Sequence, residues 1–293
     1  MHYQVTHRTA YAYSSKVFLE PHVVRLRPRC DGTQRLVRFD LRVKPKLTGL
    51  TECSDLEGNA TAQVWFEDQT DTLEIVTSFE VETLRTNPFD YVLPEVPVHT
   101  LPMIYTRELQ SPLALYCSTS GLHETVIQFA RTVAQEVDER TVPFLTQLSR
   151  RIYDACECVV REEGEAQLSE VTLAAKEGSC RDLAVLFISA CRAQGIAARF
   201  VSGYQEGVAD QEKRELHAWA EVYLPGGGWR GYDPTHGLAV ADRHIVLAAG
   251  LTPLLAAPIT GSFRGTGATA KMAADIEIKL EEKTGSKGHR RGS

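Results

Sequence analysis

The sequence lacks the features that would mark a membrane-bound or nucleic-acid-binding protein. Within its 293 residues, no run approaches the roughly 18 consecutive apolar residues that a membrane span needs. The formal net charge is −6, so there is no overall basic surface to attract nucleic acid. The segment from Met1 to His7 has no basic stretch followed by an apolar core, which is the pattern of a secretory signal. We therefore expect a cytoplasmic protein without membrane or nucleic-acid partners.

Disulfide and metal-binding patterns are also missing. The chain has seven cysteines, an odd number in a long sequence, which argues against a disulfide scaffold. No Cys-x-x-Cys pair occurs, and the spacing of Cys156 and Cys158 matches no standard zinc site. Most of these thiols should therefore be small core residues, and we expect no metal and no cofactor.

The first ~85 residues instead carry the period-2 alternation of apolar and polar residues that is typical of β-strands. The clearest alternating segments are 3–13, 37–43, 62–66 and 73–81. Turn signals such as Asp31-Gly32 separate them. Short strands of this kind predict an antiparallel sandwich in which each sheet has one face in water.

Prolines punctuate residues 86–112 and predict an extended linker there. We place the domain boundary in this stretch, with a β-sandwich domain at 1–107 and a second domain at 112–282. The small, polar and basic residues of 283–293 predict a disordered tail.

The second domain mixes helical and strand patterns, so the predicted fold class is α+β. Apolar residues at helical spacing predict helices at 126–137, after Pro143, and from Cys180 to a stop at Gly195. Strand patterns follow at 197–204, 217–224, 229–232 and, near the end, 276–280.

Cys180 stands where the third of these helices begins. Backbone N–H groups at a helix N-terminus are unpaired and the helix dipole is positive there, so both favour a thiolate. Gly178, just before, would let the backbone approach a substrate closely. Asp182 and Glu177 flank the cysteine, and for them a capping role is favoured over direct catalysis.

His217 and Asp233 supply the rest of a catalytic constellation. His217 begins one predicted strand and Asp233 ends the next, with the turn Pro225-Gly226-Gly227-Gly228 between them. In an antiparallel hairpin the start of the first strand lies near the end of the second, so the two side chains should meet. Cys180, His217 and Asp233 then provide nucleophile, base and orienting carboxylate. The thiolate would attack an amide carbonyl, and the backbone N–H of Cys180 would stabilise the oxyanion.

A family resemblance rests on these same residues. The motifs Gly178-Ser179-Cys180-Arg181-Asp182, His217-Ala218-Trp219 and Gly231-Tyr232-Asp233-Pro234-Thr235 resemble the core signature of bacterial transglutaminase-like proteins. The segments Thr6–Tyr13, Leu26–Arg29 and Asp55–Asn59 resemble the β domain that precedes this core in such proteins.

The resemblance extends through about Ile278. It implies a β-sandwich followed by a papain-like, transglutaminase-like core of helices packed on an antiparallel sheet or barrel. It also implies Cys180 as nucleophile, His217 as base and Asp233 as third member. For substrate contacts we consider Trp219, Trp229 and Tyr204, although hydrophobic packing is favoured for the two tryptophans.

The sequence departs from the family pattern at one place. Members often carry a Gly-Arg-Asp-Tyr-like stretch, whereas this chain reads Gly250-Leu251-Thr252-Pro253, so the choice of substrate is expected to differ. His236 and His244 follow Asp233 closely, but no carboxylate or cysteine at a metal-ligand spacing stands out beside them.

Two functions from different classes remain open. The first is a cysteine-nucleophile enzyme that acts on the amide bonds of a protein or peptide through a thioester, with hydrolysis favoured over transfer to an amine. The second is a binding module with a vestigial triad, whose sandwich would take a peptide by strand addition.

Overall fold

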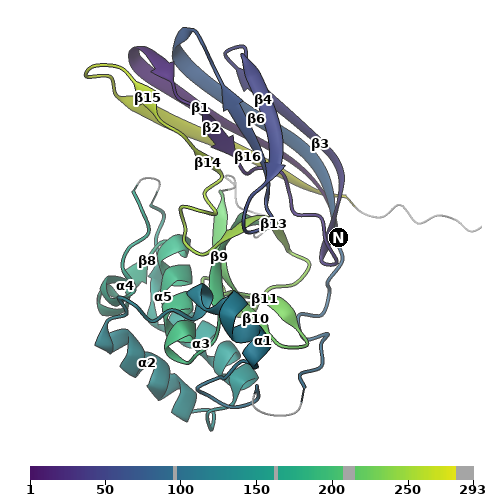
Figure 1. Ribbon diagram of the computed structural model, residues 1–293, viewed down its shortest axis with the longest axis vertical. Helices are drawn as coiled ribbons and strands as arrows, with labels where there is room; N and C mark the ends of the chain where they lie inside the picture. Colours follow the sequence, from purple (N-terminus) through teal and green to yellow (C-terminus); the bar gives the residue numbers. More distant parts are fainter. Residues whose placement is uncertain (95–97, 162–163, 207–214, 282–293) are drawn as a thin grey trace, which may run out of the picture.

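The computed structural model describes residues 1–281 except 95–97, 162–163 and 207–214. The predicted disordered tail, 283–293, lies outside the described residues. Two lobes are stacked, a sandwich of sheets and an α+β core, which agrees with the predicted fold class (Figure 1). Among the described residues, no helix combines the length and the apolar character needed to cross a membrane.

The sandwich lobe is built from two antiparallel sheets. One sheet has the order β15-β1-β6-β3 with β16 also paired to β1, and the other has the order β14-β2-β5-β4. The strands of the N-terminal segment are β1 (His2–Leu19), β2 (His22–Val24), β3 (Gln34–Lys44), β4 (Gly49–Ser54), β5 (Ala60–Trp65) and β6 (Gln69–Thr83). The C-terminal segment adds β14 (Ile259–Thr260), β15 (Phe263–Arg264) and β16 (Ala270–Glu281).

The alternation seen in the sequence holds for the long central strands. Tyr3, Val5 and Leu73 are buried in the sandwich core, while their chain neighbours point outward. The edge strand β3 is different, because its register with β6 shifts between Leu36 and Arg38. This irregularity leaves Val37 53% exposed, although the alternation predicted it on the same face as Phe39.

Strand β16 returns to the first sheet, where it runs antiparallel to β1 from the pair His2–Glu281 to the pair Tyr13–Ala270. In Figure 1 the yellow C-terminal strands lie among the purple and blue N-terminal ones. The late strand predicted near 276–280 therefore exists, but it belongs to the sandwich, whereas our division assigned 112–282 to the core.

The core lobe is a five-stranded sheet with helices against one face (Figure 1). Its strand order is β12-β11-β10-β9-β13. The strands are β9 (Ala198–Gln205), β10 (His217–Leu224), β11 (Gly228–Asp233), β12 (Leu238–Ala239) and β13 (His244–Gly250). The helices are α1 (Arg107–Leu113), the short η1 (Leu115–Cys117), α2 (Glu124–Gln135), α3 (Thr141–Ala155), α4 (Ser169–Ala175) and α5 (Cys180–Ala193). A short parallel pair, β7 (Glu157–Cys158) and β8 (Glu177–Gly178), lies just before α5.

Helix α5 is the central helix of this lobe. Leu183, Phe187 and Cys191 on α5 are buried against the sheet, which includes Ala220 and Val222 of β10. The helix ends before Gly195, which adopts φ +72 as the predicted stop signal requires. The packing of α5 on β9 and β10 holds Cys180, the first residue of the helix, over the sheet.

The predicted linker is more structured than its prolines suggested. Leu101, Met103 and Tyr105 are buried in the core lobe. The Tyr105 hydroxyl donates to the carbonyl of Tyr223 at 2.8 Å and accepts from the N–H of Ala197 at 2.9 Å. Proline removes donors and restricts φ without preventing burial, so residues 101–105 are anchored in the core. The end of the predicted linker is helical instead of extended, because it forms most of α1.

Side chains of the sandwich lobe satisfy the free edge of β13. The Gln34 amide accepts from the N–H of Val246 at 2.8 Å and donates to its carbonyl at 2.8 Å. Asn59 makes the same pair of bonds to Ala249, at 2.7 and 2.8 Å. These two side chains act as a substitute for a neighbouring strand, so they lock the lobes together along β13.

A buried ion-pair cluster also crosses between the lobes. Glu221 on β10 accepts from Arg29 of the sandwich lobe at 2.8 Å and from Arg199 on β9 at 2.7 Å. Burial alone would raise the pKa of Glu221, but the two guanidinium groups lower it to about 2. Removing one member of such a cluster leaves the others buried without their counter-charge.

We predict that Glu221→Gln lowers the free energy of unfolding at pH 7 by about 3–5 kcal/mol, measured by urea denaturation. The stabilisation by Glu221 is present above its unfolded pKa of about 4.3 and is lost as pH falls through about 2. The difference between variant and native protein should therefore shrink between pH 4 and pH 2. Asp154→Asn, which breaks the exposed pair with Arg150, is the control and should cost less than about 1 kcal/mol. An equal effect of the two substitutions would contradict the interpretation.

Candidate active site

Cys180 is the first residue of α5, as the sequence predicted. A capping box fixes this helix start, in which Asp182 Oδ2 accepts from the N–H of Ser179 at 2.8 Å and from its hydroxyl at 2.7 Å. Asp182 Oδ1 binds Arg161 Nη2 at 2.6 Å. The carboxylate is therefore fully engaged in positioning the helix, which confirms its predicted capping role.

Gly178 is needed for packing at this helix start. A Cβ at this position would lie 2.9 Å from the Cβ of Asp182 and 3.1 Å from Thr172. Gly178 therefore lets the chain approach the capping box closely, and its close approach to a substrate stays a prediction.

His217 lies between the other two members of the predicted triad. Its Nε2 is 2.7 Å from Oδ2 of Asp233, which leaves Nδ1 as the ring nitrogen available to the Cys180 thiol. Cys180 is near enough to contribute, after Asp233, to the raised pKa of His217. The His217 side chain is 11% exposed and that of Asp233 is fully buried. The hairpin of β10 and β11 thus brings the two side chains together, as the strand pattern predicted.

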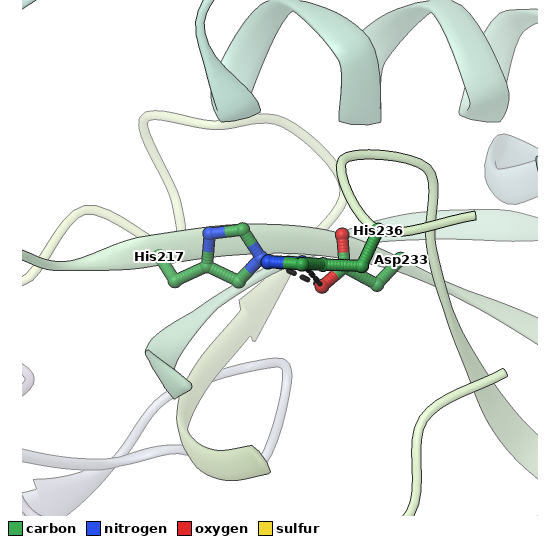
Figure 2. A group of neighbouring side chains, drawn as sticks. All are labelled: His217, Asp233 and His236. Carbon is green, nitrogen blue, oxygen red and sulfur yellow. Dashed lines mark hydrogen bonds and ion pairs between the residues drawn. The ribbon is translucent and has the colours of Figure 1, made fainter. Parts of the chain in front are cut away.

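Asp233 is the centre of a larger cluster than the sequence suggested. Besides His217, its Oδ2 contacts Nδ1 of His236 at 2.8 Å and Nε2 of His244 at 3.0 Å. Figure 2 shows His217 and His236 both directed at this carboxylate. Oδ1 accepts from the N–H of Thr235 at 2.9 Å, and Ser149 on α3 donates to the Asp233 carbonyl at 3.2 Å.

The pKa values of His217 and Asp233 follow from this arrangement. Burial alone would lower the pKa of His217, but the charge of Asp233 and the hydrogen bond to it raise the pKa to about 10. Burial alone would raise the pKa of Asp233, but the charge of His217 and the three imidazole contacts hold it well below its ordinary value. An imidazolium–carboxylate pair is therefore maintained throughout the neutral pH range.

His244 is a functional candidate that the sequence reasoning missed. It begins β13, is 2% exposed, and packs edge-on against Trp219 with ring centroids 5.2 Å apart. Burial lowers the pKa of His244, so this histidine is a neutral donor to Asp233. A neutral donor orients the carboxylate without cancelling the charge that His217 requires. Only the order of the strands, with β13 beside β9, brings it to the site.

His236 changes the interpretation of metal-ligand spacing. The sequence offers no separate carboxylate beside this histidine, but in the fold Asp233 itself is that partner. The donor atoms of His217, Asp233 and His236 all lie within 4.8 Å of one another. His236 is also the accessible member, with 38% of its side chain exposed.

The predicted substrate contacts have other roles in the structure. Tyr204 is fully buried and its hydroxyl is 2.7 Å from His7 in the sandwich lobe, so it belongs to that core. Trp219 is fully buried with Val201 and Ala249. Trp229 is half-buried beneath the Arg199 guanidinium, 4.1 Å from its ring centroid. Full burial assigns Tyr204 and Trp219 to packing, which was already the favoured interpretation of the two tryptophans. Substrate contact by Trp229 stays a prediction.

A second thiol lies near the site. Cys158 pairs with Gly178, two residues before Cys180, and its backbone position is therefore fixed beside the start of α5. Cys158 is an exposed residue, but partial desolvation by the groups packed around its thiol, with smaller contributions from the charges of Cys180 and Asp233, raises its pKa to about 11. Cys158 is accordingly expected to be a poor nucleophile at neutral pH.

Comparison with known proteins identifies both lobes. Residues 3–82 match the bacterial transglutaminase-like N-terminal region, and residues 127–234 match the transglutaminase-like superfamily core. An uncharacterized protein of Mycobacterium tuberculosis is 29% identical over 273 residues, covering 85% of this chain and 83% of that protein. A protein-glutamine gamma-glutamyltransferase of Pseudomonas aeruginosa is 37% identical over 71 residues, which cover 22% of this chain and 11% of that protein.

The fold has a counterpart among solved structures. A protein of Cytophaga hutchinsonii, provisionally described as a cysteine protease, superposes with a TM-score of 0.72 at 20% identity. The match covers 97% of this chain and 92% of that one, so the two-lobe arrangement is shared. Both the sandwich and the core are accounted for by these matches, and the chain belongs to the transglutaminase-like superfamily, with the bacterial transglutaminase-like N-terminal region preceding the core.

Proposed function

We propose that the protein is a cysteine-nucleophile enzyme that acts on amide bonds of a protein or peptide substrate through a thioester intermediate. Membership of the superfamily supports the cysteine-based enzyme class. The observation that carries the finer proposal is the 2.7 Å contact of His217 with Asp233, and the influence of Cys180 on the pKa of the same histidine supports it. Nucleophile, base and orienting carboxylate stand in the order that acyl transfer requires.

The proposed chemistry has two stages. His217 takes the proton of the Cys180 thiol, and Asp233 stabilises the resulting imidazolium. The thiolate adds to the amide carbonyl, with negative charge developing on the oxygen near the N-terminus of α5. His217 then protonates the departing amine, which leaves the acyl group on sulfur. A water molecule or a second amine, deprotonated by His217, releases the acyl group and restores the thiol.

Hydrolysis is the favoured outcome and transfer to an amine the alternative. The enzyme of Pseudomonas aeruginosa is named for transfer of the gamma-glutamyl group of protein glutamine, but it aligns with only 22% of this chain. Either outcome uses the same three side chains, because they differ only in the molecule that attacks the thioester.

A binding function is the second candidate. A cavity of about 240 Å³ opens between the two sheets of the sandwich, lined by residues of β2, β3, β4 and β5 that include Phe39, Leu41 and Thr61. A cavity of this volume would accept one or two side chains of a peptide rather than a whole strand. It favours a partner-binding role for the sandwich lobe, which is compatible with an active core.

We predict that Cys180 reacts rapidly with iodoacetamide at pH 6, at least about tenfold faster than an ordinary cysteine. The His217 imidazolium is retained up to about pH 10, so the rate should be nearly flat from pH 6 to pH 9. In His217→Ala the rate at pH 6 should fall about tenfold and rise with pH as for a free thiol. Peptide mass spectrometry of quenched samples measures each thiol separately.

Two controls are built into the same experiment. Cys158, which lies beside the start of α5, serves as the unactivated thiol and should stay slow at pH 6, because its pKa is raised. His123→Ala removes the exposed histidine that caps the N-terminus of α2 and should leave the labelling of Cys180 unchanged. Labelling of Cys180 at the rate of an ordinary thiol, without dependence on His217, would reject the enzyme and favour the binding module.

We also predict that the protein modifies glutamine-containing peptides in a Cys180-dependent way. Incubation with a peptide library and a primary amine distinguishes the outcomes by mass, because hydrolysis cleaves or deamidates the peptide and transfer adds the amine. Cys180→Ala should reduce either product about a thousandfold or more. Equal product from Cys180→Ala and native protein would exclude the proposed nucleophile.

A further inference from the structure

We propose that His217, Asp233 and His236 form a binding site for one Zn²⁺ ion, and that the metal-bound and catalytic arrangements exclude each other. Metal binding stands on the geometry of the cluster alone. The consequence for activity rests on the proposed function.

The distances suit a small metal ion. Oδ2 of Asp233 lies 2.7 Å from Nε2 of His217 and 2.8 Å from Nδ1 of His236. Zinc bonds of about 2.0–2.1 Å in tetrahedral geometry place ligand atoms roughly 3.3 Å apart. Each nitrogen–oxygen pair therefore has to widen by about half an ångström to admit a metal, and all three donor atoms already lie within 4.8 Å of one another.

The donor set is one that zinc prefers. Two imidazoles and one carboxylate leave the fourth position of a tetrahedral site open to water. The carboxylate is already oriented by further donors, since His244 binds Oδ2 and the N–H of Thr235 binds Oδ1. Hydrogen-bond donors to a metal-binding side chain fix the position of that side chain and strengthen its binding of the metal.

The cluster is accessible from solvent, and it has more hydrogen-bond donors than one carboxylate oxygen can accept. His236 is 38% exposed, so it connects the buried pair to solvent. Three imidazoles converge on Oδ2, an oxygen with two lone pairs. A metal bound by His217 and His236 would remove two of these three donors and leave His244 with the carboxylate.

The exclusion follows from the atoms involved. His217 uses the same nitrogen, Nε2, for Asp233 and for the metal. On binding, the Nε2 proton of His217 leaves to solvent, and the Nδ1 proton of His236 moves to its Nε2. The metal then accepts both nitrogen lone pairs, and His217 cannot carry the charge that stabilises a Cys180 thiolate.

The binding test uses full-length Cys180→Ser, in which no thiol remains at the nucleophile position. Zn²⁺ competed against a chromophoric chelator should bind at one equivalent. His236→Ala and His236→Gln should each weaken this binding at least about tenfold, since each removes one of three ligands. His123→Ala, in the same background, should leave it unchanged. Circular dichroism establishes that each variant is folded.

Two further readouts locate the metal. Co²⁺ in place of zinc should give the visible spectrum of a four-coordinate ion without a sulfur charge-transfer band, in native protein as in Cys180→Ser. In native protein, Zn²⁺ should slow iodoacetamide labelling of Cys180 about tenfold or more, and His236→Ala should relieve this effect relative to its own metal-free rate.

The outcomes separate this proposal from the proposed function. Absence of stoichiometric binding in Cys180→Ser, or binding that His236 variants do not weaken, would overturn the metal site. A sulfur band with Co²⁺ would overturn it in favour of a metal held by Cys180. Because affinity is measured without the nucleophile, a failure of the enzyme proposal would appear only in the labelling and peptide experiments.

Discussion

The buried carboxylate of Asp233 is the constraint on which the candidate site depends. An isolated negative charge without solvent would be strongly destabilising, so the fold has to surround it with donors. Those donors come from His217 on β10, His244 on β13 and the loop after β11. The site is therefore assembled by the sheet as a whole, and α5 adds the thiol to a base that is already oriented.

This arrangement gives the sandwich lobe a structural part in the site. β13 is an edge strand of the core sheet, with β9 on one side. On its other side Gln34 and Asn59 bind the main chain of Val246 and Ala249. Because His244 lies on the same strand, the first lobe helps to hold a donor of Asp233 in place. The two lobes thus form one unit around β13.

The sequence predicted those parts of the molecule that depend on interactions between residues close together in the chain. The alternation of β1 and β6, the helix start at Cys180 and the hairpin that joins His217 to Asp233 each involve neighbouring residues or a single tight turn. His244 was missed because its proximity to Asp233 requires β13 to lie beside β9, and no short-range pattern encodes that choice. For the same reason Tyr204 looked like a cleft residue, although its strand delivers it to the other lobe. The exposure of Val37 follows from a register shift, which depends on the partner strand as much as on β3 itself.

The pairing of β1 with β16 has a consequence for the order in which the chain folds. During synthesis β1 is made first, whereas β16, one of its two long partner strands, is made after every other described strand. Until then one side of β1 lacks this partner. The core lobe draws its described elements from a continuous stretch of chain, and its contacts need shorter loops to close. During synthesis the core is therefore free to condense while β1 still presents twelve residues of unpaired main chain, a surface that invites pairing with other chains. The arrival of β16 pairs these twelve residues of β1, and among the described strands the outer position beside β1 then belongs to β16.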